Sequence, residues 1–223
     1  MRPLLLLSML LASQVNATTV SQHDVATLPI RSLKAIQQPG EIVFMSDNGR
    51  FVIKGELFDL WTRQRVTDFA EMQQLATRLD LQKMQLDINA LNTVSLGSGS
   101  KTVVVFITTG CPHSKRLIQI SQPLTQQYRF QWVFIPENGK PGRQQVNRIL
   151  HHPSPEQALA AVADNQIDQL SLATDQDNQR HQLTELTAHL LNVDQVPFLI
   201  APDGRFQSGF PKDLSNWLAG KAK

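Results

Sequence analysis

The sequence contains a single cysteine, Cys111, among its 223 residues. An intramolecular disulfide is therefore excluded, and so is any catalytic cycle in which two thiols of the chain are oxidised together. An odd cysteine in an oxidising compartment is reactive, paired with another molecule or deeply buried. The missing second thiol constrains the chemistry of this chain more than any other feature of its composition.

The sequence also has little net charge and few long apolar runs. The formal net charge is +2, and it falls to 2 − 1 = +1 if the amino-terminal segment that carries Arg2 is removed. This balance argues against a nucleic-acid partner or a polybasic membrane contact. Beyond Ala17 the sequence has no apolar run long enough to cross a bilayer. We therefore expect no membrane insertion.

The first residues are typical of a secretory signal. Arg2 lies near the start, an apolar core covers residues 4–11, and Val15-Asn16-Ala17 forms a small-residue cleavage site. We therefore expect residues 1–17 to be a signal peptide and the mature protein to be exported, most simply to a bacterial periplasm. The remaining length of about 205 residues suits one large domain or two modest ones.

An Asn-Gly pair predicts a hairpin early in the mature chain. Asn48-Gly49 lies between two strand-like runs, residues 42–45 and 50–55, and residues 57–61 continue as a third strand or its edge. So few strands bury too little apolar surface to be stable alone, and their aromatic side chains would be an aggregation hazard unless covered.

We therefore predict that residues 18–66 form a small β-rich dimerisation domain, with an ordinary subdomain packed on its own chain as the alternative. The preceding stretch, residues 18–38, is expected to be coil or a short helix because its pattern is weak and prolines interrupt it. Residues 67–95 are predicted to be a linker whose helix covers 67–87, because apolar residues recur there at helical spacing.

The second domain, residues 96–223, begins with a strand, helix and strand at 102–107, 114–128 and 130–135. This order predicts a largely parallel sheet with a right-handed crossover. The remaining expected elements are helices at 142–150, 156–164 and 179–191, strands at 196–200 and 205–208, and a helix at 214–218. The helix at 179–191 places four leucines on one face: Leu183, Leu186, Leu190 and Leu191.

Cys111 is expected at the junction between the first strand of this domain and the following helix. Unpaired backbone N–H groups and the positive end of the helix dipole favour a thiolate there. Pro112 suits the first helical turn, and a protonated His113 would favour the thiolate further. The alternative is that Cys111 is a small buried apolar residue.

The order of these elements resembles a thioredoxin fold, and more narrowly the periplasmic DsbC/DsbG family of protein disulfide isomerases. The resemblance rests on residues 45–55, on Cys111-Pro112-His113-Ser114 and on Val196-Pro197. It implies an α/β thioredoxin-like domain with a helical insertion, preceded by a dimerisation domain and a linker helix, in a V-shaped homodimer. Ser114 stands where that family has its second, resolving cysteine.

The resemblance also implies the site residues. Catalytic roles fall to Cys111, His113 and Ser114, and substrate binding to Thr109, Pro112, Val196 and Pro197, with Pro197 at the place of the family's cis-proline. No cofactor is expected. A metal site at His151-His152 is not favoured, because no third ligand follows at a recognisable spacing.

Three functional hypotheses follow. The first is a monothiol disulfide isomerase that forms mixed disulfides with exported cysteine-containing proteins and is released by a substrate thiol, an external thiol or a membrane thiol reductase. The second is a dimeric chaperone that holds clients, with Cys111 vestigial or trapping them. The third is a one-cysteine thiol peroxidase, whose motif Thr108-x-x-Cys111 matches. It is the least favoured, because Val104 stands where that family has an upstream proline.

Overall fold

The structure, a computed structural model, describes residues 28, 32–137, 139–171 and 178–221. The predicted signal peptide at 1–17 lies outside these residues. The chain divides into two compact units, residues 1–55 and 56–223, and each is described by itself. Within the described part, no helix combines the length and apolar character needed to cross a membrane.

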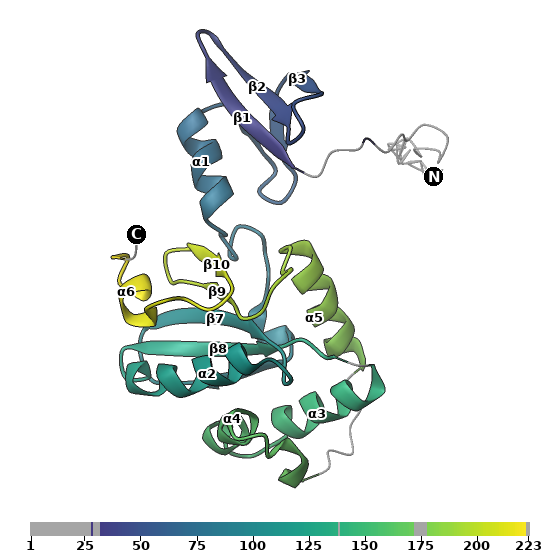
Figure 1. Cartoon of the computed structure of the whole chain (residues 1–223), viewed down its shortest axis with the longest axis vertical. Coiled ribbons are helices and arrows are strands. Elements are labelled where there is room, and N and C mark those ends of the chain that lie inside the picture. Colours follow the sequence, from purple (N-terminus) through teal and green to yellow (C-terminus); the bar gives the residue numbers. More distant parts are fainter. Residues whose placement is uncertain (1–27, 29–31, 138, 172–177, 222–223) are drawn as a thin grey trace, which may run out of the picture. The chain divides into compact units, whose positions relative to one another are not determined.

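The first unit contains a three-stranded antiparallel sheet of β1 (Leu33–Gln38), β2 (Glu41–Ser46) and β3 (Val52–Lys54), in the order β1-β2-β3 (Figure 1). The hairpin predicted around Asn48-Gly49 is confirmed, since Met45 pairs with Val52 across it. The side-chain amide oxygen of Asn48 accepts hydrogen bonds from the Ser46 hydroxyl at 2.7 Å and the Arg50 amide at 3.0 Å.

The expectation of coil or helix before this hairpin is wrong for residues 33–38, which form β1. Gln38 pairs with Glu41, so Pro39 and Gly40 make a two-residue turn. Gly40 has a φ of +82°, and a proline followed by a residue of positive φ is typical of a type II turn. Pro39 therefore starts a hairpin turn instead of ending an element.

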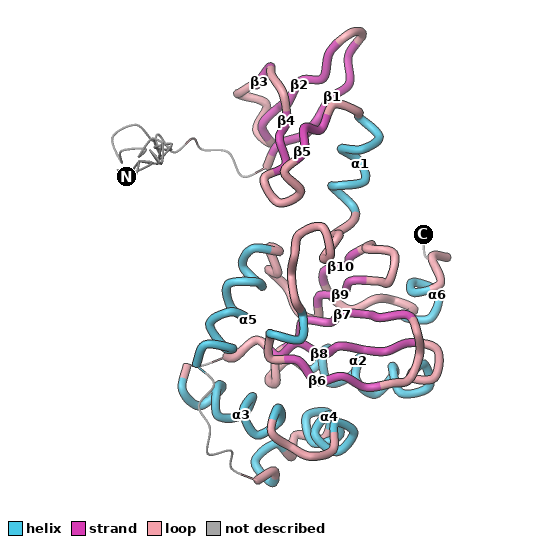
Figure 2. Tube along the Cα trace, turned by 180° about the vertical axis from the view of Figure 1, so that it is seen from behind, coloured by secondary structure: helices cyan, strands magenta, loops and turns pink. Residues whose placement is uncertain are grey.

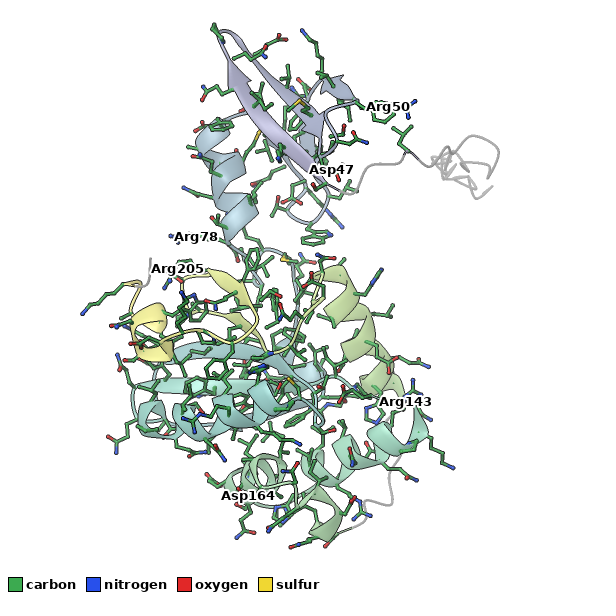
Figure 3. All side chains as sticks on the ribbon, viewed as in Figure 1. Asp47, Arg50, Arg78, Arg143, Asp164 and Arg205 are labelled. Carbon is green, nitrogen blue, oxygen red and sulfur yellow. The ribbon has the colours of Figure 1, made fainter. Side chains whose placement is uncertain are left out.

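The second unit opens with β4 (Leu57–Asp59), its antiparallel partner β5 (Gln64–Val66) and α1 (Phe69–Thr77). The carboxylate of Asp68 caps α1 by accepting a hydrogen bond from the Ala70 amide at 3.0 Å. The helix ends ten residues short of its predicted end, because Arg78 is extended and forms a β-bridge with Arg205. Figure 3 shows these two arginines close together. The backbone at Arg78 therefore pairs with the segment around Arg205 and does not continue the helix.

A five-stranded sheet forms the centre of this unit. It comprises β6 (Thr93–Leu96), β7 (Lys101–Ile107), β8 (Tyr128–Phe134), β9 (Phe198–Ile200) and β10 (Phe206–Ser208), in the order β10-β9-β7-β8-β6 (Figure 2). β7 and β8 are parallel, as predicted, and the other pairs are antiparallel. The fold is thioredoxin-like. β6 was not expected, and its residues 93–95 lie in the segment assigned to the linker.

Helices cover both faces of this sheet. They are α2 (Pro112–Ser121), α3 (Lys140–Leu150), α4 (Pro155–Ala163), α5 (Asn178–Leu190) and α6 (Leu214–Leu218), with short 3-10 turns at Ile88–Ala90, Gln122–Leu124 and Ile167–Gln169. Alternate residues of β7 enter two separate cores, Val103 and Val105 on the side of α2, α3, α4 and α6, and Val104 and Phe106 on the side of α5.

The leucine face predicted for α5 does not pack on the sheet. Leu183, Leu186 and Leu190 are exposed, and only Leu191 of the four is buried. The face that packs instead includes Thr184, whose hydroxyl accepts a hydrogen bond from the Asn92 amide at 2.9 Å, and the fully buried His181. Polar contacts in the core have therefore oriented the helix against its apolar periodicity.

Candidate active site

The loop after β7 carries Cys111 to the start of α2. β7 ends at Ile107, and Cys111 is the N-cap residue of α2 with an extended backbone and with Pro112 at the first helical position. The Cys111 carbonyl oxygen accepts the first helical hydrogen bond, from the Lys115 amide at 3.2 Å. The N–H groups of the first turn lack helical acceptors, and Cys111 is half-buried. The sulfur is thus accessible at a helix N-terminus.

The loop before β9 lies against this sulfur. The Cys111 Sγ atom is 3.6 Å from the carbonyl oxygen of Val196, within hydrogen-bond distance for a thiol. The Val196–Pro197 peptide bond is cis. Pro197 is buried and its carbonyl oxygen accepts a hydrogen bond from the Gly209 amide at 2.9 Å. Two segments 85 residues apart in sequence therefore meet at the sulfur.

Ser114 and His113 lie differently although they are neighbours on α2. The Ser114 side chain is fully buried, and its hydroxyl has no hydrogen-bond partner among the described residues. His113 is exposed, and its ring centroid is 6.0 Å from that of Phe210. Ser114 is three residues after Cys111, so the two share one side of the helix. The structure brings Ser114, and not His113, into the interior behind the thiol.

Side chains that follow β8 along the chain contact residues 108–111, the thiol loop, which joins β7 to α2. The sequence did not predict these contacts. The Thr109 hydroxyl donates to the side-chain carbonyl oxygen of Gln145 on α3 at 3.0 Å. The Gly110 amide donates to a carboxylate oxygen of Glu137 at 3.0 Å. The predicted parallel pairing of β7 and β8 could have indicated these contacts. Parallel strands bring their carboxyl ends to the same edge of a sheet, so the residues that follow the two strands lie close together.

Positive side chains follow the thiol on the first two turns of α2. Lys115 contacts the side-chain oxygen of Asn165 through its ammonium group, while Arg116 is exposed. Charges of both signs thus lie near Cys111: the Glu137 carboxylate is bonded to Gly110 before it, and Lys115 and Arg116 follow it on α2. Such an arrangement can carry out thiol chemistry at a surface that a second polypeptide can reach.

Residues 11–68 match the family described as the disulfide bond isomerase protein N-terminal domain. No curated protein sequence matches the chain.

Among solved structures, the fold is similar to a disulfide interchange protein from Neisseria gonorrhoeae, with 20% identity over 62% of this chain and 100% of that one and a TM-score of 0.50. More distant likenesses are a periplasmic thioredoxin-like protein from Salmonella enterica serovar Typhimurium (19% identity, 60% and 95% covered, TM-score 0.47) and DsbG from Helicobacter pylori (14% identity, 75% and 85% covered, TM-score 0.42). Residues 11–68 thus resemble the N-terminal domain of disulfide bond isomerases, and the part of the chain that follows has a thioredoxin-like fold.

Proposed function

We propose that this protein is a periplasmic thiol-disulfide interchange protein that isomerises disulfides of exported proteins through mixed disulfides at Cys111. The observation that carries the proposal is the meeting of an accessible sulfur, a helix N-terminus and the Val196–Pro197 loop at one point. The N-terminal domain match and the disulfide interchange protein among the similar structures support the same chemistry.

One sulfur is sufficient for isomerisation. The Cys111 thiolate attacks one sulfur of a substrate disulfide, so that a mixed disulfide forms and the other substrate sulfur leaves as a thiolate. A different thiolate of the same substrate then attacks its own sulfur in the mixed disulfide. A new substrate disulfide forms, Cys111 leaves as a thiolate, and no electrons are gained or lost overall.

Ser114 limits the protein to this route. Its buried hydroxyl lies where a second thiol would have to attack the mixed disulfide, and a hydroxyl cannot form a disulfide. If the substrate offers no thiol, release requires an external thiol or a membrane thiol reductase. Net oxidation of a substrate by a dithiol cycle within this chain is excluded, since Cys111 is the only cysteine.

Substrate recognition is assigned to the loop at Val196 and Pro197. Val196 is half-buried beside the sulfur and precedes β9, so an extended substrate segment can pair with its backbone while the substrate sulfur faces Cys111. Thr109 and Pro112, on either side of Cys111 in the sequence, are proposed to complete this binding position. His113 is proposed to tune the thiolate from the exposed first turn of α2.

A second candidate function is client binding without catalysis. The exposed row of Leu183, Leu186 and Leu190 on α5 favours it, because neighbouring apolar side chains at a surface are typical of protein contact sites. In that case Cys111 would act as a covalent trap or have no role.

Refolding of a small secreted protein with scrambled disulfides separates these functions. The wild type should accelerate recovery of native pairing, with mixed disulfides visible by mass spectrometry after acid quenching, and Cys111→Ala should match the uncatalysed rate. Equal rates for the two proteins would overturn the isomerase proposal. Suppression of client aggregation by both proteins alike would then support the second candidate.

The dimer belongs to the same proposal. The first unit exposes Val52 and Ile53 on β3, an edge strand whose outer backbone groups are open to another chain. We expect the wild type to sediment as a dimer and Ile53→Arg to shift it toward monomer, with Lys54→Gln on the same strand as the matched control. A monomeric wild type would refute the dimerisation domain.

A further inference from the structure

Glu137 contributes a negative charge to the thiol loop. Its carboxylate accepts a hydrogen bond from the Gly110 amide at 3.0 Å, and Gly110 directly precedes Cys111. A carboxylate at this position is unexpected, because a helix N-terminus that favours a thiolate is weakened by another anion beside it.

The position of Glu137 is fixed by backbone packing. A Cβ atom on Gly142, in the first turn of α3, would lie only 1.5 Å from the Glu137 carbonyl oxygen. Only a glycine therefore lets α3 approach so closely. Gln145, one turn further along α3, contacts Thr109 in the same loop at 3.0 Å. Glu137, which precedes α3, and Gln145, on α3, thus hold the thiol loop at two consecutive residues through one charged and one neutral side chain.

We propose that Glu137 is a positioning residue that also restrains Cys111: its carboxylate fixes the loop through Gly110, and its charge lowers the proportion of reactive thiolate. This inference rests on the proposed thiol chemistry at Cys111 and assigns regulation of that chemistry to Glu137. Neutralisation of the Glu137 charge by a basic segment of a bound client would relieve the restraint and favour attack when a substrate is present.

Three variants of the full chain separate the charge from the tether. Glu137→Gln keeps an oxygen that can accept the Gly110 hydrogen bond but removes the charge, and Glu137→Ala removes both. Glu156→Gln, on α4, removes a carboxylate that accepts a hydrogen bond from the nearby Ser154 hydroxyl, and it serves as the matched control. The readout is the rate of Cys111 alkylation by iodoacetamide between pH 4 and 10, with thermal unfolding as a check on folding.

The midpoint of the rate profile should move to lower pH by about 0.5 to 1 unit in both Glu137 variants. Below the wild-type midpoint, Glu137→Gln should react about two- to fourfold faster, because a larger thiolate fraction outweighs its lower intrinsic nucleophilicity. High salt should reduce the difference, since exposed charges are screened. Glu156→Gln should match the wild type.

An unchanged midpoint in Glu137→Gln would overturn the proposal, as would a shift in Glu137→Ala alone, because the carboxylate would then act only as a tether. A shift that high salt leaves untouched would also contradict a charge effect. Alkylation needs no client, so a wild type that fails to isomerise disulfides but shows the Glu137 shift would refute the proposed function and leave this inference standing.

Discussion

The amide N–H of Leu79 donates a hydrogen bond to the carbonyl oxygen of Gly204 at 2.8 Å. This bond joins the segment after α1 to the turn between β9 and β10. The Arg78 guanidinium adds a second contact, to the Asp203 carbonyl oxygen at 3.2 Å. Because β9 follows Val196 and Pro197, the end of α1 and the loop beside Cys111 are parts of one connected structure.

Gly204→Ala should disrupt this tether. Gly204 has a φ of +83°, and a Cβ atom there would lie 2.8 Å from the Leu79 carbonyl oxygen. We expect a loss of about 2 to 3 kcal/mol in the free energy of unfolding, from backbone strain and the clash together. Gly220→Ala is the matched control, since Gly220 has a φ of +73° and its Cβ position meets only ordinary contacts with the Arg205 guanidinium, the nearest at 3.6 Å, and it should lose only about 1 kcal/mol. Urea unfolding measures both, and equal losses would contradict the close approach at Leu79.

The Asp203 carboxyl group should make the same turn sensitive to acid. Partial burial alone would raise its pKa, but hydrogen bonds from Arg205 and the charges of Arg205 and Arg78 lower it below the ordinary value of 3.8. A lowered pKa means that Asp203 stabilises the fold fully above pH 3.8 and less as the pH falls through the lower folded value.

Asp203→Asn should therefore melt at a lower temperature than the wild type at pH 6. The difference should shrink as the pH falls from 3.8 through the lower folded pKa, because the unfolded carboxylate takes up its proton first and the folded carboxylate follows. Asp164→Asn, at the end of α4, controls for loss of a carboxylate elsewhere. A difference that grows on acidification would contradict the assignment.

Ser114→Ala should not destabilise the protein. The Ser114 hydroxyl is buried without a partner, so its removal relieves a desolvation cost and should leave the free energy of unfolding unchanged or raised by up to about 1 kcal/mol. Ser121, on the same helix and also fully buried, donates to the Ile118 carbonyl oxygen at 2.8 Å. Ser121→Ala should lose about 1 kcal/mol. Chemical denaturation of the pair tests the contrast, and a larger loss at Ser114 would show that its hydroxyl has a partner in solution.

Ser114→Cys should convert the site to a dithiol. The new thiol would lie one helical turn from Cys111, so the two cysteines can form a disulfide across the start of α2. Under oxidised glutathione we expect intact mass to fall by two hydrogens, and mixed disulfides with substrate to be shorter-lived than in the wild type. Two free thiols that persist under these conditions would contradict the placement of Ser114 behind the sulfur.

Asn92→Ala should be among the more destabilising single substitutions in the second unit. Asn92 is fully buried, its side-chain amide donates to the Phe134 carbonyl oxygen at 3.0 Å, and its oxygen contacts a ring nitrogen of His181 at 3.1 Å. Their loss leaves buried polar groups unsatisfied, which should cost about 2 to 4 kcal/mol of unfolding free energy. Asn89→Ala, whose side-chain oxygen accepts an exposed hydrogen bond from Gln131, should cost less than about 1 kcal/mol. Equal losses in urea unfolding would contradict the buried network.

The sequence alone determined the features that depend on neighbouring residues. The Asn48-Gly49 hairpin, the β7-α2-β8 unit and the position of Cys111 before a helix follow from turn chemistry, apolar periodicity and the place of Pro112, which are local signals. The Pro39-Gly40 turn that creates β1 was also a local signal, and it was missed because Pro39 was treated as a break.

Only the tertiary structure decided the features that depend on distant partners. Helix α1 ends at Thr77 because Leu79 bonds to Gly204, and α5 turns its leucines outward because Thr184 and His181 bond within the core. Glu137 reaches Gly110 because two parallel strands end at the same edge of the sheet. Composition and spacing do not encode such long-range hydrogen bonds, so the sequence identified the thiol and the fold identified the residues that contact its loop.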